Sequence, residues 1–210
     1  MLVSNHVSWV DILVACSLES PSFIAKEGVK AVPVVGLLAD ALFRCVFVSR
    51  GENGDTPGSA TAAVRVRLEE LAKQDGTAPP LWVFPEGTTS NGAFLLPFKA
   101  GAFLTCADVQ PVLLHYGVEP GGFSPAYESI ETGRSIFLML SQLFNSVEIT
   151  YLPVCSAAKG EQPAAYAEHV RTEMLHASHG RLTPSSLSLK DKRAYHAALR
   201  AAAAAKPKSQ

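Results

Sequence analysis

The sequence predicts an α/β fold in which a mixed central sheet is flanked by helices. Short apolar runs rich in β-branched and aromatic residues recur along the chain, and longer stretches with helical periodicity separate them. The chain has 210 residues, of which 48% are hydrophobic and 18% are charged. This composition supplies a substantial core for one domain and excludes an intrinsically disordered chain.

Strands are predicted where a short apolar run lies between turn-forming residues. The segment Met1–Ser4 is strand-like but too short for a full strand, so we expect this chain to be a truncated piece of a longer protein. The other predicted strands are Ser22–Lys26, Cys45–Arg50, Leu81–Glu86, Val109–Tyr116 and Val147–Val154.

Helices are predicted where apolar residues recur with the period of an α-helix. The clearest case begins at Ser59, because Ala60, Val64 and Leu68 fall on one face of the helix. The predicted helices are Ser8–Leu18, Val29–Phe43, Ser59–Gln74, Arg134–Phe144, Pro163–Ala177 and the Ala-rich stretch Lys190–Ala205.

The charge is distributed unevenly, although the net charge is only −1. From Arg181 onward there are seven basic residues and one acidic residue, so the rest of the chain is acidic. This argues against a nucleic-acid partner, which would favour a basic body. It fits a tail that touches anionic phospholipid head groups, or a basic tail that is simply solvated. We therefore divide the chain into a domain over residues 1–180 and a basic, Ala-rich helical tail over residues 181–210. No apolar run is long enough to predict a membrane-spanning helix.

The cysteines are too far apart in the sequence to form a zinc or redox motif. Each lies among apolar neighbours, and we expect free, mostly buried thiols in a reducing compartment. They are Cys16, Cys45, Cys106 and Cys155.

The first candidate for chemistry is the segment NHVSWVD, which contains His6, Ser8 and Asp11. His6 is expected where a strand ends, Ser8 as the N-cap of the next helix, and Asp11 in the first turn of that helix. A carboxylate on one ring nitrogen of histidine fixes the tautomer and leaves the other nitrogen to take a proton. The segment holds a base and its orienting group without a nucleophile, which suits activation of a substrate hydroxyl. The same spacing also arises by chance, because the chain has six histidines and six aspartates.

The second candidate is the segment FPEGTTSNG, in which an apolar strand runs into Glu86, Gly87 and small hydroxyl residues. Open α/β sheets bind ligands in loops at the carboxyl ends of their strands. Gly87 would let backbone amides approach an anion or a polyol, and Glu86 would accept hydrogen bonds from substrate hydroxyls. The alternative is a tight turn whose hydroxyls satisfy the backbone.

The third candidate is Arg50 at the end of the segment CVFVSR. A guanidinium at a strand end can hold a phosphate through paired donors, although most such arginines are surface residues. Lys26 and Lys99 are weaker candidates for the same role.

Together these segments resemble the conserved blocks of the PlsC-like glycerolipid acyltransferases. NHVSWVD is similar to the first block, CVFVSR to the second, FPEGTTSNG to the third, and VQPVLLHY at Val109–Tyr116 to the fourth. The continuation LLPFKAGAF at Leu95–Phe103 is similar to eukaryotic lysophosphatidylcholine and lysophosphatidylethanolamine acyltransferases. The resemblance implies a fold like that of glycerol-3-phosphate acyltransferase, with residues 1–180 as the acyltransferase domain.

The resemblance also implies a reaction, namely transfer of an acyl group from acyl-CoA to the free hydroxyl of a lysophospholipid. It implies His6 as general base, Asp11 as its partner, and no acyl-enzyme, metal or bound cofactor. The residues implied for binding the glycerol and phosphate of the acceptor are Arg50, Glu86, Gly87 and Thr88.

The implied location is a membrane surface, at the endoplasmic reticulum, with the active site facing the cytosol or the membrane interface. The apolar segment Ser135–Phe144 could face lipid, but a buried core helix is the more favoured interpretation of it. Two other functions remain open. One is a non-catalytic lipid-binding remnant of a truncated acyltransferase. The other is an acyl-CoA hydrolase in which His6 activates water.

Overall fold

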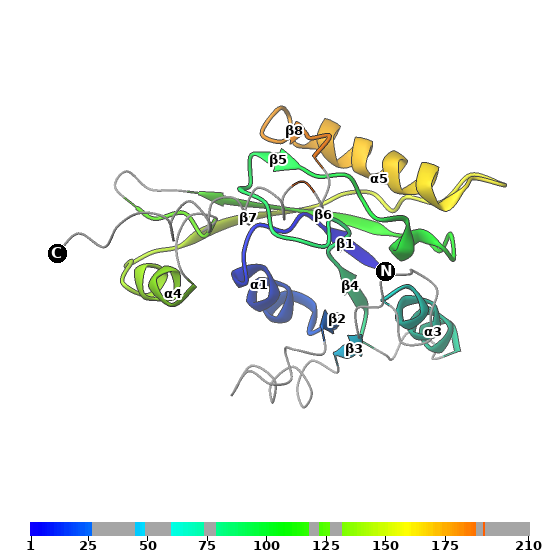
Figure 1. Cartoon of the computed structure of the whole chain (residues 1–210), viewed down its shortest axis with the longest axis horizontal. Helices are drawn as coiled ribbons and strands as arrows, with labels where there is room; N and C mark the ends of the chain where they lie inside the picture. Colours follow the sequence, from blue (N-terminus) through cyan, green and yellow to red (C-terminus); the bar gives the residue numbers. More distant parts are fainter. Residues whose placement is uncertain are drawn as a thin grey trace.

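The computed structural model describes residues 1–26, 45–48, 60–73, 79–117, 122–126, 132–187 and 191. Its main element is a six-stranded sheet with the order β3-β2-β4-β1-β6-β7 (Figure 1). Every neighbouring pair is parallel except β6 and β7, so the predicted mixed sheet is confirmed. The strands are β1 (Leu2–Ser4), β2 (Ser22–Lys26), β3 (Val46–Val48), β4 (Leu81–Val83), β6 (Gln110–Gly117) and β7 (Ser146–Tyr151).

The short strand β1 lies inside the sheet, where it pairs with β4 on one side and with β6 on the other. Leu2 and Val3, which the sequence marks as strand-like, thus lie in a strand of three residues. Three residues suffice because all of them are buried and both ladders are satisfied. The Ser4 hydroxyl also accepts a 2.8 Å hydrogen bond from the indole Nε1 of Trp82.

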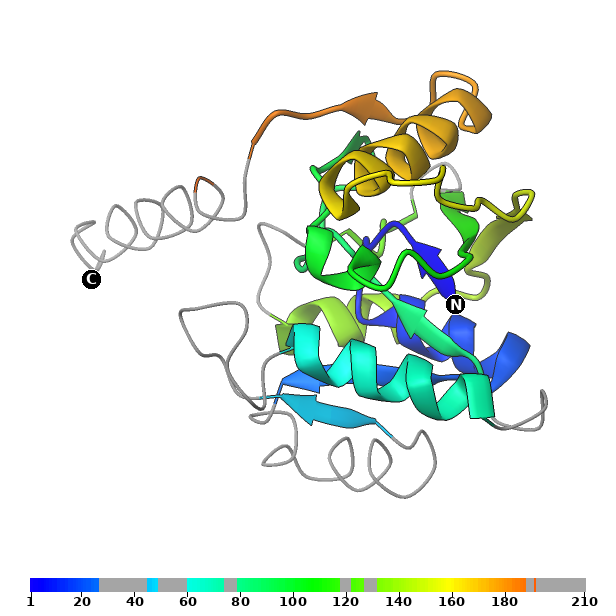
Figure 2. The ribbon, with the colours of Figure 1, turned by 90° about the vertical axis from the view of Figure 1, so that its right-hand side faces the viewer.

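Successive side chains of β1 point to opposite faces of the sheet and enter two different cores. Val3 packs with Phe103 and Tyr166 beneath α5, whereas Leu2 packs with Ala15 of α1 on the other face. Figure 1 shows α5 on one side of the sheet and α1 and α4 on the other, and Figure 2 shows α3 beside β2 and β3. The helices are α1 (Val10–Glu19), α3 (Ala60–Lys73), α4 (Thr132–Leu140), α5 (Pro163–Ala177) and the 3-10 turn η2 (Ala100–Phe103).

Packing of the domain continues past residue 180, where the sequence predicted the tail to begin. The strands β5 (Phe94–Leu95) and β8 (Thr183–Pro184) form a small parallel sheet. Arg171 of α5 ties them together, because one of its nitrogens donates to the carbonyls of Leu95 and Ser185 at 2.9 and 3.0 Å.

Helix α4 corrects the interpretation of Ser135–Phe144 as a buried core helix. Ser135 and Met139 are buried, but the side chains of Phe137, Leu140, Leu143 and Phe144 are between 70% and 91% exposed. We call these four side chains the α4 apolar patch.

Two predicted helices, Val29–Phe43 and almost all of Lys190–Ala205, lie outside the described residues. Among the residues that are described, no helix has both the length and the hydrophobicity needed to cross a membrane.

Candidate active site

His6 lies directly after β1, at the carboxyl edge of the parallel strands. Its Nδ1 is 2.8 Å from Oδ2 of Asp11, and its side chain is 17% exposed. A carboxylate only accepts hydrogen bonds, so Nδ1 carries the proton and Nε2 has the lone pair that can take another. The structure thus brings together the two residues that the sequence predicts as base and partner.

Asp11 lies in the first turn of α1 and is fully buried. Its Oδ2 also accepts hydrogen bonds from the backbone N–H groups of Val7 and Ser8, at 2.6 and 2.9 Å. The carboxylate therefore folds back over the chain that enters the helix, as the spacing predicts. The expectation that Ser8 is the N-cap is wrong, because the helix begins at Val10 with Trp9 at the cap position. Asp11 binds the amides before the helix, and the Ser8 hydroxyl accepts only a long 3.4 Å bond from Val10.

The plane of the His6 ring is set by Phe84 at the end of β4. The two rings stack with their centroids 4.1 Å apart and an interplanar angle of 20°. Stacking and the bond to Asp11 restrain the imidazole along two different directions. Sequence reasoning did not assign this role to Phe84.

Glu86 has a different environment from the one predicted for an acceptor-binding residue. Its side chain is buried, and its two oxygens accept hydrogen bonds from the backbone N–H groups of His6 and Leu96, at 2.8 and 3.0 Å. In this position the carboxylate joins the loops that follow β1 and β4. A contact with a substrate hydroxyl would have to compete with these bonds, so the acceptor role of Glu86 stays a prediction.

Gly87 and Thr88 lie in the turn after Glu86, and Thr88 is half-buried. Gly87 has a φ of +68°, and a Cβ added there would lie 2.7 Å from Cε of Lys99 and would overlap its ammonium group. The positive φ favours glycine, and the missing Cβ leaves room for the end of the Lys99 side chain. This places a cation beside the predicted phosphate-binding loop.

Two further residues belong to the segments described in the sequence, Asn5 of NHVSWVD and Arg50 of CVFVSR. The Asn5 side chain bonds the backbone of Leu114 in both directions at 2.9 Å and so holds the His6 loop against β6. Arg50 lies outside the described residues. The strand before it, β3, runs parallel to β2, so its carboxyl end is on the same edge of the sheet as His6.

A third group, which sequence reasoning missed, contacts the His6–Asp11 pair. The Tyr116 hydroxyl lies 2.5 Å from Oδ1 of Asp11, on the side of the carboxylate away from His6. The available signal was the alternation of β6, which puts Val112, Leu114 and Tyr116 on the face that α1 covers.

The four cysteines are all described, free and half-buried, and none belongs to the His6–Asp11 pair. Burial, followed by the neighbouring Cys45, raises the pKa of the Cys16 thiol to about 11. Within the described ranges, no three His, Cys, Asp or Glu side chains cluster as metal ligands would.

The fold and the site define an α/β domain with a histidine–carboxylate pair at the carboxyl edge of its parallel strands. The sequence model of the Acyltransferase family matches residues 1–115, which is more than half of the chain. The chain therefore belongs to the acyltransferase family, as its motifs predicted.

Individual relatives agree with this assignment. The chain is 43% identical over 200 residues to lysophospholipid acyltransferase LPEAT1 of Arabidopsis thaliana, a match that covers 94% of this chain and 49% of the relative. It is 34% identical over 179 residues to lysophosphatidylcholine acyltransferase 1 of Danio rerio, covering 83% of this chain and 33% of the relative. The chain thus spans half or less of these relatives.

A solved structure supports the fold. The 1-acyl-sn-glycerophosphate acyltransferase PlsC from Thermotoga maritima superposes with a TM-score of 0.53 at 24% identity. The superposition covers 87% of this chain and 67% of that protein. The predicted glycerol-3-phosphate acyltransferase-like architecture is therefore confirmed at the level of the fold.

Proposed function

We propose that this chain transfers an acyl group from acyl-CoA to the free hydroxyl of a lysophospholipid. The observation that carries the proposal is the pair formed by His6 and Asp11, in which Nδ1 binds the carboxylate and Nε2 is left to act as a base. The relatives named as lysophospholipid and lysophosphatidylcholine acyltransferases support the choice of acceptor.

In the proposed reaction, His6 Nε2 takes the proton of the acceptor hydroxyl as its oxygen attacks the thioester carbonyl. The carbon–sulfur bond then breaks, and the CoA thiolate leaves and takes the proton from the imidazolium. Asp11 stabilises that imidazolium. Because the acceptor oxygen attacks the thioester directly, the proposed reaction has no acyl-enzyme, and it uses no metal or bound cofactor. Arg50, Glu86, Gly87 and Thr88 remain our candidates for binding the acceptor.

Lys99 strengthens the proposed phosphate site. Its ammonium lies against Gly87, in the loop that follows β4. A lysophospholipid carries a phosphodiester, and an ammonium at this loop supplies a complementary charge.

The experiment that tests this function measures transfer from labelled acyl-CoA to a panel of lysophospholipids. His6→Ala should lower kcat by at least ~10²-fold, which is the scale of a general base, and Asp11→Asn should also be severely impaired. His169→Ala is the matched control, because His169 also lies beside a carboxylate, with Nδ1 3.6 Å from Glu161. Near-normal turnover in a folded His6→Ala variant contradicts the mechanism. Release of free fatty acid without any lysophospholipid points instead to the hydrolase.

We further propose that the protein works at a membrane surface, at the endoplasmic reticulum, with its site facing the cytosol or the membrane interface. The α4 apolar patch supports contact with lipid, because its four large side chains are exposed. It is also close to the site, since Phe144 and Tyr116 line one pocket and Tyr116 contacts Asp11.

Vesicles of phosphatidylcholine and phosphatidylserine test this membrane contact. Replacing Phe137 and Leu140 by serine should lower cosedimentation with the vesicles, because apolar burial at the lipid interface is lost. Val154→Ser is the control, since Val154 is exposed but lies outside the patch. Unchanged vesicle binding together with an altered oligomeric state would show that the patch binds another protein surface.

A further inference from the structure

Tyr116 contacts Asp11 of the proposed catalytic pair through the carboxylate oxygen that His6 does not bind. Its hydroxyl is 2.5 Å from Asp11 Oδ1, whereas His6 Nδ1 is 2.8 Å from Oδ2 of the same carboxylate. Tyr116 belongs to β6 and Asp11 to α1, and the two residues are 105 positions apart in the sequence. The three groups form a chain from phenol to carboxylate to imidazole.

The direction of the hydrogen bond follows from the chemistry of the two groups. A carboxylate accepts only, so the phenol donates. The pKa of the Tyr116 phenol lies far above its usual value. Burial is the largest cause, followed by the negative charge of Asp11 and by the hydrogen bond between Tyr116 and Asp11. Tyr116 therefore remains a neutral donor over the whole working range of pH.

The hydrogen bonds of Asp11 are unequally divided between its two oxygens. Oδ2 has three donors, namely His6 Nδ1 and the backbone N–H groups of Val7 and Ser8. Among the described residues, Oδ1 is bonded by Tyr116. All three of these bonds are to one oxygen, so the carboxylate can still pivot about Oδ2. The bond to Oδ1 fixes the other end.

We propose that Tyr116 is a positioning residue of the acyl-transfer reaction, which locks the Asp11 carboxylate in the orientation that holds His6. This inference rests on the proposed function. It predicts that Tyr116 acts through Asp11 and on the chemical step rather than on the binding of either substrate.

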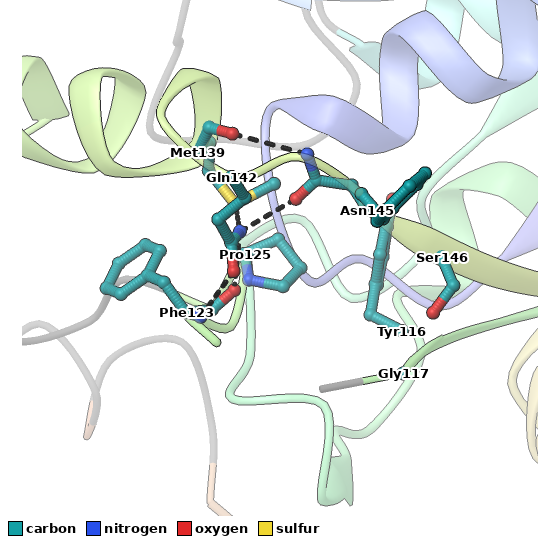
Figure 3. A pocket seen from close by; sticks show the side chains of 9 residues that line it. Tyr116, Gly117, Phe123, Pro125, Met139, Gln142, Asn145 and Ser146 are labelled. Atoms are coloured by element: carbon teal, nitrogen blue, oxygen red, sulfur yellow. Dashed lines mark hydrogen bonds between the residues drawn. The ribbon is translucent and has the colours of Figure 1, made fainter. Parts of the chain in front are cut away.

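The ring of Tyr116 packs against the core cluster that contains Val112 and Leu114, so a variant without the hydroxyl can keep this packing. Figure 3 shows the ring beside Pro125, Asn145 and Ser146 in a pocket at the end of α4. The Gln142 side chain fixes this wall, because it bonds both the backbone N–H and the carbonyl of Phe123, at 2.5 and 3.1 Å. A phenylalanine at position 116 keeps the packing and removes only the donor.

The test compares Tyr116→Phe with Tyr166→Phe in the acyl-transfer assay. Tyr166 is the matched control, because its hydroxyl is also bonded, to the Cys155 carbonyl at 2.7 Å, but lies with α5 on the other face of the sheet. We expect Tyr116→Phe to lower kcat about ten- to hundredfold, the scale of one hydrogen bond to a charged group, with both KM values unchanged. Tyr166→Phe should keep wild-type kcat.

A double mutant separates positioning from a purely structural role. If Tyr116 acts through Asp11, then adding Tyr116→Phe to Asp11→Asn costs no further activity. Additive losses in the double mutant overturn the proposal, as does wild-type kcat in Tyr116→Phe.

A second variant keeps the test open if Tyr116→Phe does not fold. Introducing 4-aminophenylalanine at position 116 retains the ring and an N–H donor, so kcat should stay within about threefold of wild type. A loss of kcat larger than tenfold in this folded variant overturns the proposal. Absence of any acyl transfer by the wild-type chain and by Tyr166→Phe is a separate result, which contradicts the proposed function itself.

Discussion

The buried carboxylate of Glu86 gives the sharpest prediction, because the structure and the sequence suggest different roles for it. Its two oxygens accept backbone hydrogen bonds from His6 and Leu96. Glu86→Gln keeps the shape of the side chain but leaves it with one acceptor oxygen. One of the two backbone N–H groups then faces the NH2 group of the glutamine side chain, which is also a donor. Losing one hydrogen bond to a charged group costs about 1.5–3 kcal/mol, and the bond that remains is weakened to neutral strength. We expect the free energy of unfolding to fall by about 2–4 kcal/mol.

Urea unfolding monitored by tryptophan fluorescence measures this change, because Trp82 lies in the core next to the site. Glu148→Gln is the matched control, since Glu148 is 57% exposed and forms a surface ion pair with Arg181 at 2.7 Å. That variant should lose less than about 1 kcal/mol. The reasoning is refuted if Glu86→Gln unfolds like wild type while the KM for lysophospholipid alone rises about tenfold, the result that an acceptor-binding carboxylate predicts.

Three further predictions concern the cysteines and Arg50. Replacing all four cysteines by alanine should leave kcat within about threefold of wild type, and a stable thioester trapped on any of them from acyl-CoA would contradict the proposed direct transfer. The Cys16 thiol should react slowly with iodoacetamide at pH 8, because a pKa of about 11 leaves roughly one thousandth of it as thiolate, and alkylation followed by mass spectrometry should show the rate rising toward pH 11. Arg50→Ala should raise the KM for lysophospholipid roughly ten- to hundredfold with little change for acyl-CoA, and Arg50→Lys should recover only part; a defect confined to acyl-CoA would move Arg50 to the donor site.

Local patterns predicted most of the elements. Strand β2 and helix α5 have the predicted bounds, Ser22–Lys26 and Pro163–Ala177, because apolar periodicity and flanking turn residues are local signals. The strands β5 and β8 were not predicted. They have two residues each, and Arg171 joins them from a third element. A two-residue strand carries no periodicity, so only the fold reveals it.

The site shows the same division between local and long-range signals. His6 and Asp11 are five positions apart and their contact was predicted, because the first turn of the helix folds the Asp11 carboxylate back toward the residues before it. One partner of Glu86 is the backbone of His6, 80 positions away, and Tyr116 is 105 positions from Asp11. In a parallel sheet, neighbouring strands are distant in the sequence, so such contacts follow from strand order rather than from spacing.

Among the described residues, the arrangement of hydrogen bonds explains how His6, the proposed base, is presented beside several other polar groups. Asn5 and Glu86 bond backbone groups of the surrounding loops and strands, and Asp11 is fully buried beneath four donors. Glu86 holds the backbone of His6 and Asp11 holds its ring, and the His6 side chain is 17% exposed. The geometry of the proposed base is therefore set before substrate binds, and hydrogen bonds built in advance need no reorganisation during the proposed proton transfer. Cutting any one of these internal bonds should consequently lower kcat more than it raises either KM.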